Sequence, residues 1–180
     1  MIKIVVIGVG GRMGKAISEC IEDTEGVSIA GGTESPGHFA IGSDLGEFTG
    51  IGKKEISIVE NIETALIDSD VIIDFTTPES SLKTLDAAVS CKKSVVMGTT
   101  GFSIEQKKYI AQAAEKIRCV FAPNMSIGVN VLFKIVEDVS KALGDAYDVE
   151  IMEAHHKFKK DAPSGTAVRL SEIIADSLDR

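Results

Sequence analysis

IKIVVIGVGGRMG, residues 2–14, is the stretch of sequence that decides the fold. Its first six residues are almost all apolar and β-branched, which is typical of a strand buried on both faces of a parallel sheet. Glycines follow at once at Gly8, Gly10, Gly11 and Gly14, and apolar residues then recur at helical spacing. The stretch therefore predicts a strand, a glycine turn and an amphipathic helix, which together open a βαβ unit.

The same alternation continues to about residue 125. Further strands are predicted at residues 27–31, 70–75, 94–97 and 118–122, and further helices after the caps Thr77-Pro78 and Ser103 with Gln106. We interpret the glycine-rich residues 33–55 as a surface excursion that carries little chemistry. Strands that alternate with helices predict an α/β fold, a Rossmann-like doubly wound parallel sheet.

A second, smaller α+β domain is predicted after this sheet. Apolar residues recur at helical spacing between residues 131 and 143, and residues 147–154 are predicted to form a strand. We expect the first domain to cover residues 1–126 and the second to cover residues 127–180.

Composition excludes several classes of partner. The chain has 180 residues, with 19 Lys and Arg against 27 Asp and Glu, which gives a formal charge of −8. This balance argues against nucleic acid or a membrane as partner, because both bind basic faces. No apolar run reaches the roughly 18 residues of a membrane helix and no leader precedes the first strand, so we expect a cytoplasmic protein. We interpret Cys20, Cys91 and Cys119 as buried small hydrophobes, with Cys20 on the apolar face of the first helix.

The glycine turn offers what a dinucleotide needs. A pyrophosphate approaches backbone that lacks Cβ, and the free amides at the start of a helix supply donors. The spacing departs from G-x-G-x-x-G, because Met13 occupies the third glycine position. Glu34, which ends the second predicted strand, is placed to accept from a ribose hydroxyl. The alternative is that the glycines only form a tight turn.

Residues beyond the turn bear on the choice of cofactor. Ser35 stands where an arginine would bind a 2′-phosphate, so NADH should bind at least as well as NADPH, although Arg12 can partly compensate. Residues 98–101 and 122–125 follow the carboxyl ends of predicted strands. They are placed to flank a nicotinamide, or they are ordinary turns.

Residues 153–166, EAHHKFKKDAPSGT, reverse the sign of the charge locally. Positive charge in an acidic protein attracts anions, and histidine transfers protons near neutral pH. Gly165 and Thr166 fall in the first turn of a predicted helix, whose free amides would seat a carboxylate. The lysines and these amides together predict a substrate with more than one carboxylate. The alternatives are a solvated loop of charges, or a metal site made of His155, His156 and Asp161. The metal site is weakened because adjacent strand residues point to opposite faces.

Five motifs can now be taken together: GVGGRMG at residues 8–14, DFT at 74–76, GTTG at 98–101, NMSIGVN at 124–130 and EAHHKFKKDAPSGTA at 153–167. In this order, across nearly the whole chain, they resemble the 4-hydroxy-tetrahydrodipicolinate reductase (dihydrodipicolinate reductase) family. The resemblance implies NAD(P)H-dependent reduction of 4-hydroxy-tetrahydrodipicolinate to tetrahydrodipicolinate in the diaminopimelate pathway of lysine biosynthesis. It also implies a cytoplasmic homotetramer, in which residues 1–126 form the dinucleotide-binding domain and residues 127–180 form the substrate-binding and tetramerisation domain.

The resemblance further implies a role for each matching residue. The pyrophosphate would be held by Gly8, Val9, Gly10, Gly11, Arg12 and Met13, the adenosine ribose by Glu34, and the nicotinamide side by Gly98, Thr99, Thr100, Ala122, Pro123, Asn124 and Met125. His155 would be the proton donor or acceptor and Lys159 a proton donor. The substrate ligands would be His156, Gly165 and Thr166, and no metal is expected.

Two departures from the family affect these expectations. Ser35 replaces the arginine that is common in members using NADPH, and the family continues beyond Arg180 with further strands, so we expect a C-terminally truncated second domain. One alternative is a reductase acting on another small dicarboxylate. Another is a non-catalytic NAD(H)-binding protein or an inactive truncated relative. The histidine and lysine motif favours the reductase.

Overall fold

The computed structural model describes residues 1–157 and 162–180. The chain forms two compact units, Met1–Phe121 and Ala122–Arg180. The division between them falls a few residues before the boundary expected from the sequence. Within the described ranges, no helix is both long enough and apolar enough to cross a membrane.

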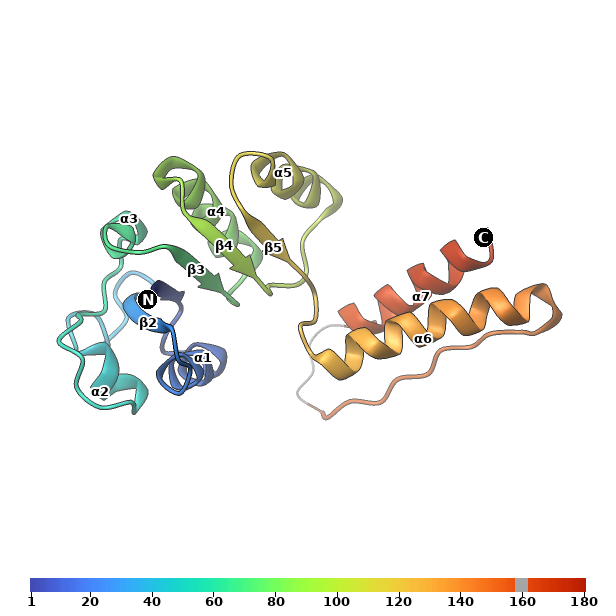
Figure 1. Cartoon of the computed structure of the whole chain (residues 1–180), viewed down its shortest axis with the longest axis horizontal. Coiled ribbons are helices and arrows are strands. Elements are labelled where there is room, and N and C mark those ends of the chain that lie inside the picture. Colours follow the sequence, from blue (N-terminus) through green and yellow to red (C-terminus); the bar gives the residue numbers. More distant parts are fainter. Residues whose placement is uncertain (158–161) are drawn as a thin grey trace. The chain divides into compact units, whose positions relative to one another are not determined.

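The first unit contains a five-stranded sheet with the order β2-β1-β3-β4-β5, in which every strand pair is parallel (Figure 1). This topology confirms the Rossmann-like doubly wound sheet. Its elements are β1 (Ile2–Ile7), α1 (Arg12–Glu22), β2 (Val27–Thr33), α2 (Leu45–Thr49), α3 (Ile62–Leu66), β3 (Val71–Asp74), α4 (Pro78–Cys91), β4 (Ser94–Met97), α5 (Ile104–Ala114) and β5 (Cys119–Phe121).

The apolar run of β1 explains why helices cover both faces of the sheet. Successive side chains of a strand point to opposite faces. Val5 and Ile7 accordingly belong to one buried cluster, which includes residues of α3, α4 and α5, whereas Ile4 and Val6 belong to a second cluster with residues of α1 and α2. β1 therefore lies at the centre of two cores.

Local capping signals are confirmed. The side chain of Thr77 accepts from the Ser80 amide at the start of α4, with proline at the first helical position. At the start of α5, Ser103 and Gln106 form a reciprocal capping box. These caps satisfy amide groups that a helix start leaves without intrahelical partners.

The interpretation of residues 33–55 as a surface excursion is wrong in part. The segment contains α2, and both Ala40 and Leu45 are fully buried in the second core cluster. Its glycines had suggested little structure, but the side chain of Asp44 accepts from the Glu47 amide and caps α2. The segment is therefore part of the core.

The predicted burial of Cys20 is also wrong, because this side chain is exposed. Helix α1 instead buries Gly14, Ser18 and Ile21, and Ser18 Oγ donates to the Gly14 carbonyl oxygen. The small residues Gly14 and Ser18 let the helix pack close to the sheet on the face that they share, and Cys20 lies outside this buried face. Cys119 is half-buried, and desolvation raises the pKa of its thiol.

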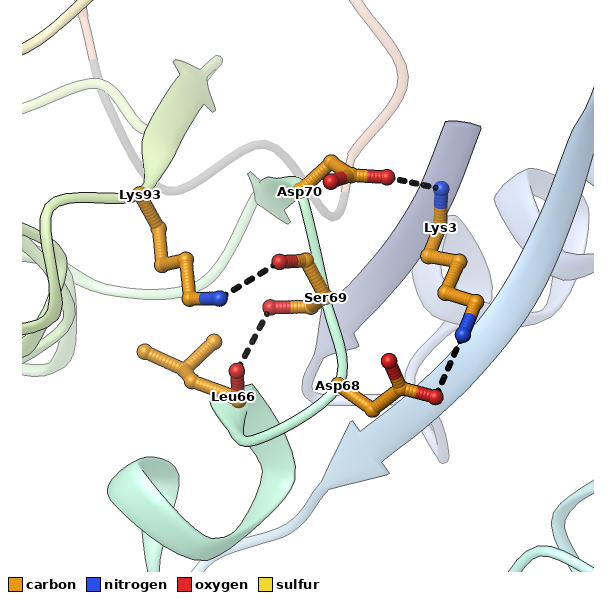
Figure 2. Close-up of polar contacts among 6 residues, drawn as sticks. All are labelled: Lys3, Leu66, Asp68, Ser69, Asp70 and Lys93. Carbon is orange, nitrogen blue, oxygen red and sulfur yellow. Dashed lines mark hydrogen bonds and ion pairs between the residues drawn. The ribbon is translucent and has the colours of Figure 1, made fainter. Parts of the chain in front are cut away.

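Polar contacts fasten the chain before β3 to the amino ends of its neighbouring strands (Figure 2). The backbone amide of Lys3 donates to Asp70 Oδ2 at 2.8 Å, and the Lys3 ammonium pairs with Asp68. From the other side, Lys93 Nζ donates to the Ser69 carbonyl oxygen at 2.6 Å. These contacts lie at the opposite edge from the carboxyl ends of the strands, where ligands bind in open α/β sheets.

The second unit pairs two helices, α6 (Ile127–Leu143) and α7 (Gly165–Ser177), with a 3₁₀ turn at Gly144–Ala146 after α6. The strand predicted at residues 147–154 is wrong, because these residues form no strand. A strand needs a hydrogen-bonded neighbour, and the described part of this unit contains only helices, the short turn and irregular backbone.

Candidate functional site

The glycine turn packs the start of α1 directly against the end of β1. The amides of Gly8 and Val9 both donate to the Thr33 carbonyl oxygen, at 2.9 and 3.1 Å. A Cβ on Gly14 would lie 2.2 Å from the Gly8 carbonyl oxygen. Only glycine allows this approach, so the turn is built for backbone to come close to a ligand or to other backbone.

The start of α1 has the properties of an anion site. Its N-cap, Gly11, supplies no capping side chain, and no acidic residue occupies the first turn. The amide groups of a helix start and its dipole favour negative charge. A cavity of about 510 Å³ opens here, and its lining includes Gly10, Gly11, Arg12 and Met13. Gly8 also lines this cavity, whereas the side chain of Val9 is fully buried in the second core cluster.

Glu34, the residue directly after β2, reaches back to the glycine turn. Its Oε1 accepts from the Gly10 amide at 2.7 Å, and its Oε2 accepts from the Ser35 amide at 3.0 Å. The carboxylate therefore lies on the wall of the cavity, beside the predicted pyrophosphate site. A negative charge in this position disfavours a second anion in direct contact with the carboxylate itself.

His38 is a cavity residue that sequence reasoning missed. Its ring lies beside Gly10, and its Nδ1 accepts from the Ala40 amide at 3.2 Å. The Phe39 ring packs against it with centroids 4.5 Å apart. A lone histidine in a glycine-rich segment gave no signal in the sequence, because its position depends on the fold of residues 33–55.

A buried carboxylate links the loops at the carboxyl ends of β3 and β4. Asp74 is fully buried, and its Oδ1 accepts from the amide and hydroxyl of Thr76, at 2.9 and 2.6 Å, and from the Thr99 hydroxyl at 3.5 Å. Ser81 Oγ donates to Thr99 Oγ1 at 2.7 Å. Within the described ranges, Asp74 Oδ2 has no hydrogen-bond partner. Sequence reasoning noted the motif around Asp74 but not this network.

The predicted nicotinamide loop after β4 is held by the same network. The Gly98 amide donates to the Asp74 carbonyl oxygen at 2.9 Å, and a Cβ on Gly98 would lie 2.0 Å from the Phe75 ring. Thr99 is buried and Thr100 is exposed. The structure thus places this loop at the ligand-binding edge of the sheet.

In the second unit, residues 122–125 lead into α6 and contact the start of α7. Asn124 Nδ2 donates to Thr166 Oγ1 at 3.3 Å, and the Asn124 carbonyl oxygen accepts from Asn130 Nδ2 at 3.1 Å. Ala122, Pro123 and Asn124 line a cavity of about 270 Å³. Met125 is exposed.

The start of α7 lies where the sequence predicts. Ser164 is the N-cap and accepts from the Ala167 amide at 3.1 Å, so Gly165 and Thr166 occupy the first turn. Among the residues that the structure describes, nothing accepts from the amides of Gly165 and Thr166. Two donors at a positive helix end make this turn a site for an anion.

The Glu153 carboxylate joins His155 to α7. Its Oε2 lies 2.7 Å from His155 Nε2, and its Oε1 accepts from the Ser164 amide at 2.8 Å. Hydrogen bonds with Ser164 and His155 lower the pKa of Glu153 to about 2. The carboxylate is therefore ionised at neutral pH and can only accept hydrogen bonds.

His156, Lys159 and Asp161 are the remaining residues of the histidine-containing segment that the sequence singles out. His156 is exposed and takes part in an interaction. Lys159 and Asp161 lie outside the described residues, so the structure does not address the proton donor Lys159 or the alternative metal site. In residues 1–157 and 162–180, no three His, Cys, Asp or Glu side chains are grouped closely enough to hold a metal ion.

A doubly wound parallel sheet with a glycine turn against the first helix, a carboxylate from the second strand and a separate histidine-containing unit defines the class of NAD(P)-dependent oxidoreductases. The chain belongs to the dihydrodipicolinate reductase family. The sequence model described as dihydrodipicolinate reductase, N-terminus, matches residues 2–125, and the one described as dihydrodipicolinate reductase, C-terminus, matches residues 128–180.

Individual relatives agree with this membership. The 4-hydroxy-tetrahydrodipicolinate reductases of Geotalea daltonii and Hahella chejuensis are 49% and 47% identical to the whole chain, which covers 67% of each. The solved structure of dipicolinate-bound dihydrodipicolinate reductase from Paenisporosarcina sp. TG-14 has a TM-score of 0.76 and 31% identity, over 99% of this chain and 67% of that one. A probable dehydrogenase from Thermotoga maritima, with a TM-score of 0.55 and 15% identity, shares the fold alone.

Proposed function

We propose that this chain catalyses NAD(P)H-dependent reduction of 4-hydroxy-tetrahydrodipicolinate to tetrahydrodipicolinate, the step of lysine biosynthesis for which its relatives are named. The observation that carries the proposal is the segment around His155. It combines a proton-transferring ring, tied to the start of α7, with a helix turn in which two amides have no acceptor among the described residues. This combination suits a small substrate with carboxylates and a carbon to be protonated.

The first unit fits the cofactor. The Gly14 position, where any Cβ would meet the backbone of Gly8, lets the start of α1 lie against the turn. The amides of the first turn of α1 would then face the pyrophosphate. We assign Gly8, Val9, Gly10, Gly11, Arg12 and Met13 to the pyrophosphate, Glu34 to the adenosine ribose, and Gly98, Thr99, Thr100, Ala122, Pro123, Asn124 and Met125 to the nicotinamide side. When bound, the reduced nicotinamide supplies a hydride.

The second unit supplies protons and holds the substrate. We assign to His155 the protonation of the ring carbon next to the one that receives the hydride, and to Gly165, Thr166 and His156 the binding of substrate carboxylates. Lys159 is assigned as a proton donor from the family membership alone. Orientation of the substrate by these groups contributes the rest of the rate enhancement.

The position of Glu34 supports NADH as a cofactor at least as good as NADPH. Its carboxylate lies on the Gly10 amide, and Ser35 offers no positive charge to a 2′-phosphate. A carboxylate accepts from a ribose hydroxyl but repels a phosphate in the same place.

The assembly and domain roles belong to the same proposal. We assign residues 1–126 to cofactor binding and residues 127–180 to substrate binding and assembly, in a cytoplasmic homotetramer. The apolar residues Val131, Ile135 and Val139 are exposed along α6, which supports a role of this unit in association.

The direct test mixes the 180-residue chain with NADH or NADPH and freshly generated 4-hydroxy-tetrahydrodipicolinate, and follows the nicotinamide absorbance. Oxidation that depends on substrate is expected with both cofactors. Replacing His155 with Ala should leave the Kd for NADH unchanged and lower kcat by about 10²- to 10⁴-fold. Tight NADH binding without oxidation in the parent chain would overturn the reductase and favour a non-catalytic NAD(H)-binding protein.

A further inference from the structure

We propose that Glu153 is the positioning residue of His155: it fixes the ring with its proton on Nε2, which assigns proton exchange with the substrate to Nδ1. The inference deepens the proposed function and rests on it for the identity of the substrate. The arrangement of Glu153, His155 and Ser164 carries it independently of any cofactor.

The contact between the two side chains is direct. His155 Nε2 and Glu153 Oε2 are 2.7 Å apart, a distance typical of a charge-assisted hydrogen bond. The side chains are partly shielded from solvent, with 40% of His155 and 28% of Glu153 exposed. Partial shielding strengthens such a contact relative to one between fully exposed groups.

Glu153 is itself held in place from a second side. Its Oε1 accepts from the Ser164 backbone amide, 11 residues along the chain, at 2.8 Å. Ser164 caps α7, so the carboxylate is fixed to the same helix start that presents Gly165 and Thr166. One side chain therefore sets the His155 ring relative to the two amides assigned to the substrate.

The chemistry of the pair determines the tautomer. An ionised carboxylate has no proton to donate, so the hydrogen between the two groups belongs to His155 Nε2. In the neutral ring, Nδ1 is then the basic nitrogen. A carboxylate that orients a histidine and stabilises its charged form is a recurring arrangement in acid–base catalysis.

With the proton on Nε2 held by Glu153, His155 delivers a proton to the substrate from Nδ1. Loss of the 4-hydroxyl group and a hydrogen of the neighbouring carbon as water makes the substrate a conjugated imine, and the hydride adds to the carbon that carried the hydroxyl. The electron pair of the enamine double bond so formed takes the proton on Nδ1 of the His155 imidazolium at the neighbouring carbon, which forms the new carbon–hydrogen bond and restores the imine. The ring becomes neutral and keeps its proton on Nε2, hydrogen-bonded to Glu153. Nδ1 then takes a proton from water for the next cycle.

Glu153→Gln tests the assignment with little change in shape. The amide oxygen of Gln can still accept from the Ser164 amide, so the link to α7 is retained. Its amide group then donates to His155 Nε2, which forces the proton onto Nδ1, the opposite tautomer. Glu150→Gln is the matched control, because this nearby exposed carboxylate undergoes the same chemical change.

The first readout is ¹⁵N NMR of the His155 ring in the 180-residue chain without cofactor. The parent and Glu150→Gln should show protonated Nε2 and unprotonated Nδ1 in the neutral ring, and Glu153→Gln should show the reverse. His155→Ala assigns the signals. Protonated Nδ1 in the parent, or the same tautomer in the parent and Glu153→Gln, would overturn the proposal.

The second readout is turnover. Glu153→Gln should lower kcat by about 10²- to 10⁴-fold, with a much smaller change in KM. Glu153→Asp, which keeps the carboxylate, should lose less of the rate, and the control Glu150→Gln should keep the kcat of the parent. Equal kcat in Glu153→Gln and the parent would also overturn the proposal. If the parent itself shows no turnover, the proposed function fails, and the NMR result still decides whether Glu153 sets the tautomer.

Discussion

Gly14→Ala tests whether the close approach of α1 to the glycine turn builds the cofactor site. The new Cβ would lie 2.2 Å from the Gly8 carbonyl oxygen and 2.6 Å from Val9 Cα. Ordinary contact begins near 3.4 Å, so the helix start must move by 3.4 − 2.2 = 1.2 Å. Both neighbours are backbone atoms, which cannot turn aside as a side chain does.

This displacement sets the expected magnitudes. Overpacking costs typically about 1–3 kcal/mol, and contacts with backbone place this variant near 3 kcal/mol. Alanine returns at most about 1 kcal/mol of helix propensity relative to glycine. We therefore expect a net loss of about 2 kcal/mol in the free energy of unfolding. Misplacing one charge-assisted hydrogen bond to the pyrophosphate costs about 1.5–3 kcal/mol, which is about 10- to 100-fold in the Kd for NADH.

Urea denaturation followed by circular dichroism measures the first quantity, and NADH fluorescence titration measures the second. Gly128→Ala is the matched control, because it makes the same change in the first turn of α6, where the nearest atom is 3.8 Å away. This control should gain up to about 1 kcal/mol. Parent-like unfolding and an unchanged Kd for NADH in Gly14→Ala would refute the reasoning.

Four further predictions concern single side chains. Glu34→Gln removes the negative charge beside the glycine turn, so the ratio of Kd for NADPH to Kd for NADH should fall in fluorescence titrations; an unchanged ratio counts against this role. Cys20 should react with a thiol reagent before Cys119, because Cys20 is exposed and burial raises the pKa of the Cys119 thiol; mass spectrometry of the labelled peptides reports the order, and the reverse order contradicts the packing. The folded-state pKa of Glu153, about 2, is lower than its ordinary value of 4.5, so its contribution to stability is present above pH 4.5 and lost as the pH falls to about 2. The difference in Tm between the parent and Glu153→Gln should shrink over that interval, and a constant difference would disprove the linkage. Asp74→Ala leaves an amide and two threonine hydroxyls without their acceptor and should cost about 1–3 kcal/mol in urea denaturation; Asp74→Asn keeps an acceptor and should cost less, so equal losses would argue against the network.

Features that depend on neighbouring residues could be predicted from the sequence. The caps at Thr77 and Ser103 are contacts between residues three apart, and the structure contains both. The strand β1 and the glycine turn could also be recognised, because each is set by consecutive residues. Because each of these signals is short, reading them in order was enough to predict the doubly wound sheet.

Features that depend on distant residues could not be predicted in this way. Residues 147–154 have the composition of a strand, but pairing requires a neighbour that composition does not supply. The face that α1 buries is set by the closeness of Gly14 to Gly8, and this contact exposes Cys20. Hydrophobic spacing alone gave the wrong face because it does not register how near the backbone can come.

In the candidate site, too, the features set by neighbouring residues could be predicted, and those set by distant residues could not. The glycine turn and the segment around His155 are continuous in sequence, and both were found. The acceptor for Thr99 is Asp74, 25 residues away, and Glu153 is joined to Ser164 across 11 residues. Such partners are brought together only when the strands and the start of α7 are in place, so their roles emerge from the fold.

The central position of β1 also constrains the order of events during folding. β1 is synthesised before the other strands of this sheet, but the contact between Lys3 and Asp70 that brings it beside β3 spans 67 residues. At a translation rate of about 5–20 residues per second, the ribosome needs about 3–13 s to supply that partner. During this time β1 can pair only with β2, and its other edge stays open, as an apolar strand prone to aggregation. Folding of this unit should therefore be slow for its size and most vulnerable before residue 74 has emerged.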